Sequence, residues 1–112
     1  MANPSKQKGT AAETAVVRYL NEQGWPEVER RTLSGSNDKG DIAGLRRLVV
    51  EVKACKAMDL SGWLHEVRRE VLAAGADFGV IWHKRRGKTH PTDWYVTMRG
   101  GDFVQLLKEA GR

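Results

Sequence analysis

The chain has 112 residues and a mass of 12.5 kDa, which is the size of one domain rather than two. Hydrophobic residues make up 40% and charged residues 29%, a composition that excludes both a disordered tail and a membrane protein. Cys55 is the single cysteine, so an internal disulfide is excluded. Because the N-terminus also lacks the apolar stretch of a signal peptide, we expect a cytoplasmic protein without membrane contact.

Positive charge dominates the chain. Lysine and arginine number 19 against 14 aspartates and glutamates, a net charge of +5 with a pI near 9.7. The charge is concentrated at Arg30-Arg31 and in the run Lys84-Arg85-Arg86-Gly87-Lys88. An excess of this kind favours association with polyanions, so nucleic acid is the first partner to consider.

A helix is predicted over residues 10–23, after a flexible basic segment at residues 1–9. Glu13 lies in the middle of its narrow apolar face, where a carboxylate is unexpected. One interpretation is a capping box, in which Glu13 reaches back to the amide of Thr10. The other is that Glu13 points across the sheet toward a metal or a water. The two interpretations are compatible.

Three strands are expected next, over residues 27–33, 41–45 and 48–54. The intervening segment 34–40 is rich in turn residues and is predicted to be a loop. We expect the second and third strands to form an antiparallel hairpin through Arg46-Arg47.

The second half of the chain is predicted to hold a helix at 61–74, strands at 78–82 and 94–98 around a basic loop, and a helix at 101–110. The last helix is expected to bury three apolar side chains, those of Phe103, Leu106 and Leu107. The resulting order α-β-β-β-α-β-β-α predicts an α/β fold, a mixed β-sheet flanked by helices in a single domain over residues 10–112.

The strand at 48–54 carries the most informative residues. Glu51 and Lys53 alternate onto the same face, roughly 6–7 Å apart along the backbone. The hairpin would bring Asp41 beside Glu51, and two converging carboxylates repel each other unless a hard divalent cation holds them. An adjacent lysine can orient the attacking water. These three residues predict a metal-dependent phosphodiesterase site.

The geometry of the hairpin adds a condition. A strict two-residue turn at Arg46-Arg47 would pair Asp41 with Val52 and so place it on the face opposite to Glu51. The site therefore requires a loop of odd length, or a bulge or bend between Gly40 and Gly44.

The order of these residues resembles the PD-(D/E)XK nuclease superfamily, and most closely the archaeal-type Holliday junction resolvases. The matching residues are Lys8-Gly9, Glu13, Ser34 or Ser36, Asp41, Glu51 and Lys53. The resemblance covers residues 8–57 closely and continues loosely to Met98, with Gly40 in place of the proline that names the motif. It implies a restriction-endonuclease-like mixed β-sheet flanked by helices.

The resemblance also implies roles for individual residues. Asp41, Glu51 and the backbone carbonyl of Val52 would bind Mg²⁺ or Mn²⁺, and Lys53 would position the water. Glu13 would complete the catalytic site or hold a second metal. Contacts to DNA would come from Lys8, Arg30, Arg31, Ser34, Ser36, Lys84, Arg85, Arg86 and Lys88.

The function implied is a Mg²⁺-dependent DNA endonuclease that acts as a homodimer, nicking opposing strands of a four-way junction. The compact size favours recognition of DNA shape over base sequence. Three alternatives stay open: another endonuclease of the same fold, of repair, mismatch or restriction type; a non-catalytic nucleic-acid-binding module on that fold; and a small basic RNA-associated protein without an active site.

Overall fold

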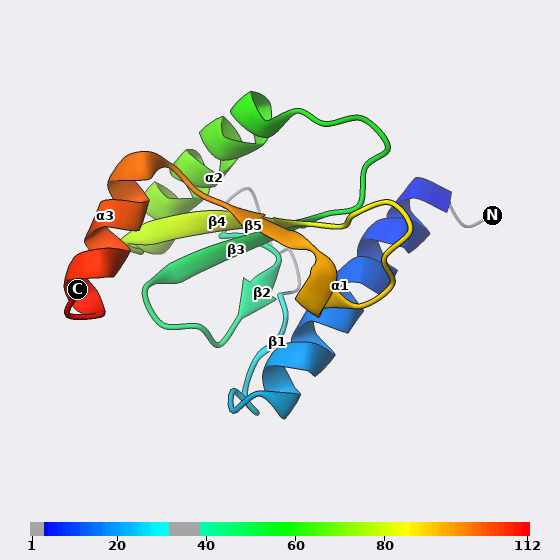
Figure 1. Cartoon of the computed structure of the whole chain (residues 1–112), viewed down its shortest axis with the longest axis horizontal. Helices are drawn as coiled ribbons and strands as arrows, with labels where there is room; N and C mark the ends of the chain where they lie inside the picture. Colours follow the sequence, from blue (N-terminus) through cyan, green and yellow to red (C-terminus); the bar gives the residue numbers. More distant parts are fainter. Residues whose placement is uncertain (1–3, 32–38) are drawn as a thin grey trace.

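The computed structural model describes residues 4–31 and 39–112, and a three-stranded mixed sheet lies at its centre (Figure 1). Its order is β3-β4-β5, with β3 parallel to β4 and β4 antiparallel to β5. A second, two-stranded antiparallel sheet pairs β1 with β2. The strands are β1 (Glu29–Arg30), β2 (Ile42–Ala43), β3 (Leu48–Lys53), β4 (Phe78–His83) and β5 (Tyr95–Thr97).

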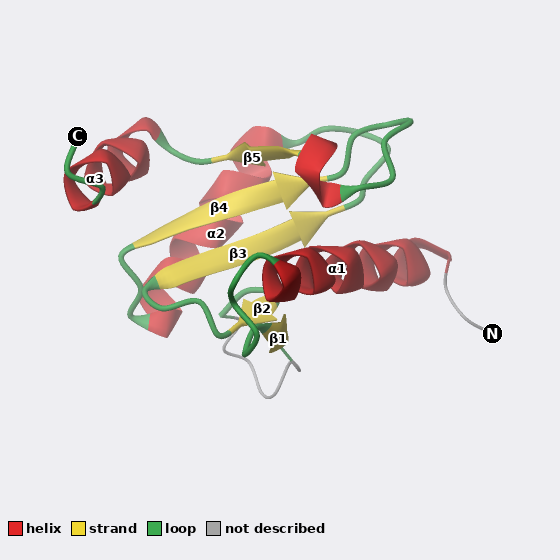
Figure 2. Ribbon diagram, turned by 60° about the horizontal axis from the view of Figure 1, so that its bottom comes forward, coloured by secondary structure: helices red, strands yellow, loops and turns green. Residues whose placement is uncertain are grey.

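Three helices surround the sheet (Figure 2). They are α1 (Pro4–Glu22), α2 (Leu60–Ala74) and α3 (Gly100–Glu109), and a short 3-10 turn spans Pro91–Asp93. Helix α2 lies behind β3 and β4, while α1 runs along β3 on the other side. The architecture is therefore mixed α/β, as predicted. None of the helices in the described part of the chain is long and apolar enough to span a bilayer.

Alternation along β3 divides the core into two layers. Val50 and Val52 pack with Ala12 and Val16 of α1. Val49 packs on the opposite face against Trp63, Val67 and Val71 of α2. Side chains two residues apart on a strand point to the same face. Glu51 and Lys53 therefore project from the same face of β3 as Val49, the face covered by α2.

Helix α1 begins at Pro4, six residues before the predicted start, so the prediction of a flexible segment is wrong for residues 4–9. Proline suits a first helical position because the amide that it lacks would have no partner there. Thr10 is consequently inside the helix, where its carbonyl accepts a hydrogen bond from the Thr14 hydroxyl at 2.9 Å. The capping-box interpretation of Glu13 is therefore wrong.

The predicted hairpin is also wrong in its pairing. Strand β2 pairs with β1, and the ladder partner of β3 is the parallel strand β4. Gly40 and Gly44, where a distortion was expected to be easy, have positive φ angles of 98° and 99°. A Cβ on Gly40 would lie 2.8 Å from Val49 Cγ1, so only glycine fits where the chain turns past β3.

The strand predicted at 27–33 is regular only at Glu29–Arg30, and its last two residues lie outside the described residues.

Helix α3 does not bury the residues expected of it. Phe103 and Leu106 are 49% and 39% exposed, and the buried residue of the helix is Asp102. The Asp102 carboxylate accepts a hydrogen bond from the Gly79 amide at 3.4 Å. The amphipathic pattern predicted that these apolar residues share one side of the helix. No element of the described chain covers that side.

Helix α2 approaches β4 unusually closely at Gly79. A Cβ there would lie 2.4 Å from Val67 Cγ1 and 2.8 Å from Val71 Cγ2. We therefore expect Gly79→Ala to lower the free energy of unfolding by about 1–3 kcal/mol, the usual cost of overpacking a filled core. Urea titration of both proteins measures the difference. Gly101→Ala is the control, since a Cβ at Gly101 meets no atom within 4 Å; equal stability of the two variants would contradict the prediction.

Candidate active site

Three segments bring the four predicted catalytic residues together. Glu13 comes from α1, Asp41 directly precedes β2, and Glu51 and Lys53 lie on β3. The charge of Asp41 acts on all three of the others, raising the pKa of each. We call these four residues the acidic site. Asp41 lies along the edge of β3 that is not paired with β4, and Glu51 and Lys53 project from β3 toward α2.

Asp41 is fixed against β3 by backbone hydrogen bonds. Its amide donates to the Val50 carbonyl at 3.0 Å, and its Oδ2 accepts from the Val52 amide at 2.8 Å. The φ of 98° at Gly40 sets this approach, and proline, held near −65°, cannot adopt it. Proline therefore could not replace Gly40 in this backbone conformation.

Glu51 is buried, with only 3% of its surface exposed. Its Oε2 lies 3.7 Å from Lys53 Nζ. Burial raises the pKa of the Glu51 carboxyl far above its ordinary value, and a side-chain hydrogen bond with Glu70 and the negative charges of Asp41 and Glu70 raise it further. Lys53 opposes this rise only in part. A buried acid in this state favours a cation as partner.

Lys53 lies between Glu51 of β3 and Glu66 of α2. Its Nζ lies 3.7 Å from Glu51 Oε2 and 3.5 Å from Glu66 Oε2. Burial alone would lower the pKa of the ammonium, but the charges of Glu51, Glu66 and Asp41 outweigh it and raise the pKa. The lysine is consequently charged at neutral pH. It acts as a hydrogen-bond donor and an electrostatic partner, not as a proton acceptor.

Glu13 closes the site from the α1 side. Its Oε1 accepts a hydrogen bond from Arg30 Nε at 3.1 Å, which forms an ion pair between α1 and β1. Burial and the charge of Asp41 raise the pKa of Glu13, while Arg30 and Lys53 lower it. Arg30 was predicted to contact phosphate, and in the structure it is engaged with this carboxylate.

Two acidic residues of the site were missed in the sequence. Glu66 and Glu70 project from α2 toward Glu51, and one carboxylate oxygen from each of the three lies within 4.8 Å of the others. Glu70 is 2% exposed. Its position three residues after Val67 places it on the apolar stripe of α2. That is the same anomaly that singled out Glu13, so the signal was present.

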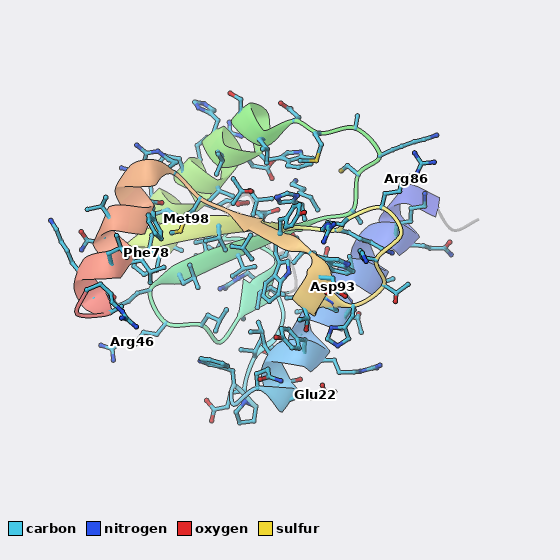
Figure 3. The ribbon with its side chains drawn as sticks, in the orientation of Figure 1. Glu22, Arg46, Phe78, Arg86, Asp93 and Met98 are labelled. Atoms are coloured by element: carbon cyan, nitrogen blue, oxygen red, sulfur yellow. The ribbon has the colours of Figure 1, made fainter. Side chains whose placement is uncertain are left out.

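A groove of about 630 Å³ continues from the end of β3, and we call it the basic groove. Its basic lining residues are Lys8, Lys56, Lys84, Arg85 and Arg86. Lys53 directly precedes the lining residue Ala54, and its carbonyl accepts a hydrogen bond from the amide of the lining residue Lys84 at 2.8 Å. Figure 3 shows Arg86 at the side of the molecule where the N-terminal half of α1 lies. The structure thus gathers four predicted DNA contacts, and it adds Lys56.

Aromatic side chains support the basic groove. The Arg85 guanidinium lies 4.4 Å from the centroid of Tyr95, and the Lys84 ammonium lies 5.8 Å from that of Trp94. Lys88 does not line the groove; its carbonyl accepts from the Trp94 indole at 2.9 Å. Arg31 is exposed next to the acidic site.

Ser34 and Ser36, which were also predicted to contact DNA, lie outside the described residues.

Comparison of the chain with family models, with curated proteins and with solved structures gives no match. Function is therefore inferred from the chemistry of the acidic site and of the basic groove next to it.

Proposed function

We propose that the protein is a Mg²⁺-dependent endodeoxyribonuclease of the PD-(D/E)XK type, with a restriction-endonuclease-like fold, that cuts four-way DNA junctions. One observation carries the proposal. The carboxylate of Asp41 is hydrogen-bonded to the amide of Val52, the residue between Glu51 and Lys53. Asp41 is thereby held beside the strand that carries Glu51 and Lys53, and a groove lined by cations begins where that strand ends.

The donor set fits a hard divalent cation. Carboxylate oxygens of Asp41 and Glu51, with the Val52 carbonyl, are ligands that Mg²⁺ and Mn²⁺ prefer. The hydrogen bond from the Val52 amide to Asp41 Oδ2 holds one of these carboxylates beside the residue that follows Glu51, which supports the fit. When bound, the cation polarises the scissile phosphate and stabilises the charge that develops on it.

The remaining residues would act on the water and the phosphate. The Lys53 ammonium donates a hydrogen bond to the attacking water and fixes its direction, which contributes through positioning. Glu13, which pairs with Arg30 at 3.1 Å, would be the third acid beside the water, with Asp41 and Glu51. The basic groove would bind the phosphate backbone, an interaction that supplies affinity without reading base sequence.

Resolution of a junction needs two symmetric cuts, and one chain offers one such site. A two-fold homodimer supplies both. Exposed apolar side chains on β5 and α3 support that face as the contact between copies. They are Val96, Phe103, Val104 and Leu106.

The experiment compares a four-way junction, linear duplex and single-stranded DNA, each incubated with Mg²⁺ or with EDTA. We expect paired nicks on opposing strands of the junction, at least tenfold slower cutting of duplex, and no cutting with EDTA. Sedimentation velocity at micromolar concentration should give the mass of two chains. Equal rates on duplex and junction, or a monomer, would favour the general endonuclease instead. Binding without cutting in Mg²⁺ and in Mn²⁺ would favour the non-catalytic module.

A further inference from the structure

The basic groove is lined by apolar side chains as well as by cations. Met58 and Tyr95 both line it, and both are large apolar side chains that stay exposed in the described chain, at 57% and 55%. We infer that the groove receives an unpaired DNA nucleotide, with its base against Tyr95 and Met58 and its phosphates against the lining lysines and arginines. The inference rests on the proposed function, because it names the kind of DNA that this groove takes.

Tyr95 is aligned with the lysine of the acidic site. Its register partner on β4 is His83, and the partner of His83 on β3 is Lys53. Residues paired in this way point to the same face of a sheet, so the three side chains form one row across it. Figure 2 shows β3 and β4 ending at the same edge of the sheet, with β5 beside β4.

The length of this row sets how far a base at Tyr95 is from the acidic site. Neighbouring strands lie about 4.8 Å apart, which places the Cα of Tyr95 roughly 10 Å from that of Lys53. A stacked DNA strand rises about 3.4 Å per nucleotide. The base at Tyr95 therefore belongs to a nucleotide within about three positions of the phosphate next to Lys53.

Neighbouring side chains hold Tyr95 in place. The His83 ring lies at 70° to it, with centroids 6.0 Å apart, and His83 Nε2 is 2.8 Å from the Thr97 hydroxyl oxygen. The Arg85 guanidinium lies 4.4 Å from the Tyr95 centroid, and its Nη1 donates a hydrogen bond to the Asp93 carbonyl at 2.8 Å. Unpaired bases stack on aromatic rings and on guanidinium planes, and this fixed pair offers both.

The tryptophans near the groove cannot make this contact. Trp63, which lies 6.2 Å from the His83 ring, is 8% exposed, and Trp94 is 6% exposed. His83 itself is buried at 5% exposure. Among the described residues that line the groove, Tyr95 is therefore the one that offers an exposed aromatic ring.

Charge and shape together select an unpaired nucleotide. The described residues that line the groove include no acid, and their lysines and arginines suit a phosphate backbone. Inorganic phosphate would leave Met58 and Tyr95 without a partner, and the bases of a duplex are stacked on their neighbours inside it. An unpaired base presents its flat apolar face with the least cost of unstacking. The flexible thioether of Met58 adapts to bases of different size.

The test measures the binding of two short DNA chains to the full-length protein in EDTA, by fluorescence anisotropy. One is an oligothymidylate of about 12 nucleotides, and the other is an abasic chain with the same number of phosphates. We expect the wild type to bind the oligothymidylate roughly tenfold more tightly, the effect of one stacked base.

Variants of Tyr95 assign this preference to its ring. Tyr95→Leu should bind both chains with the affinity that the wild type has for the abasic chain, whereas Tyr95→Phe should keep the preference. Unchanged affinity for the abasic chain shows that Tyr95→Leu is folded. Trp25→Leu removes an exposed aromatic ring outside the groove and is the control, which should also keep the preference.

The single cysteine reports where the DNA lies. Cys55 is exposed and lines the basic groove, so bound oligothymidylate should slow its alkylation by iodoacetamide. Unchanged alkylation with DNA bound would overturn the inference. Equal affinity of the wild type for the two chains, or the wild-type preference in Tyr95→Leu, would do the same.

Cleavage separates this inference from the proposed function, because binding is measured without metal. A protein that prefers oligothymidylate through Tyr95 and cuts no DNA in Mg²⁺ or Mn²⁺ would refute the nuclease and leave the inference standing. A protein that cuts junctions and binds the two chains equally would refute the inference alone.

Discussion

Asp41→Asn, Glu51→Gln and Lys53→Ala should each slow DNA cleavage by about 10³-fold, within the range found when one group of a catalytic constellation is removed. The first two substitutions remove the negative charge that holds the cation. The third removes the ammonium that lies 3.7 Å from Glu51 and positions the water. Single-turnover cleavage of a labelled junction at saturating Mg²⁺ measures each rate.

Affinity for DNA should change little in these variants, because binding depends on the basic groove. Neutralising a carboxylate also reduces repulsion of phosphate, so Asp41→Asn and Glu51→Gln should bind DNA at least as tightly as the wild type in EDTA. Glu22→Gln and Lys108→Ala are matched controls on exposed positions and should cleave normally. Wild-type cutting by Lys53→Ala would refute the role given to the lysine. Parallel loss of binding and cutting in all three variants would indicate unfolding instead.

The double variant Lys56→Ala/Arg86→Ala should weaken DNA binding roughly 30-fold at 0.15 M salt. The binding constant falls with salt concentration raised to a power, and each lost phosphate contact lowers that exponent by about 0.9. Both side chains line the basic groove and are exposed. The slope of log K against log salt should fall by about 1.8 in magnitude. Fluorescence anisotropy at several salt concentrations measures both quantities.

The control removes the same charge from the opposite end of the molecule. Arg46 is exposed there, far from Arg86 (Figure 3), and Lys108 lies on α3. Arg46→Ala/Lys108→Ala should leave the salt slope within experimental error of the wild type. If both double variants lowered the slope equally, net charge rather than the basic groove would bind DNA. Cleavage at saturating DNA should be normal in both.

Local patterns were sufficient to predict much of the acidic site. The two-residue period of β3 placed Glu51 and Lys53 on one face, and the pair does lie together. Gly40 and Gly44 were expected to make a departure from regular strand geometry easy, and both have positive φ angles. Both features depend on a few neighbouring residues, which is why the sequence reveals them.

Features that depend on distant contacts were missed. The partner of β3 is β4, a parallel strand reached only after α2, and no local signal distinguishes it from the nearer β2. The start of α1 was placed too late because residues 4–9 are polar and carry no apolar periodicity. Glu70 occupies an apolar position on α2, but the sequence does not reveal that this position faces Glu51 of a strand nineteen residues earlier.

The hydrogen bonds of Asp41 also determine how the sheet can associate with other chains. Strand β3 is an edge of the three-stranded sheet, and edge strands template the addition of foreign strands. Here the Val50 carbonyl and the Val52 amide are both occupied by Asp41, at 3.0 and 2.8 Å. The residue that would hold the cation thus also blocks strand addition along this edge. Continuation of the sheet between chains would therefore have to proceed from β5. Asparagine at position 41 would preserve both hydrogen bonds, whereas alanine would expose the Val52 amide and keep only the backbone bond to the Val50 carbonyl.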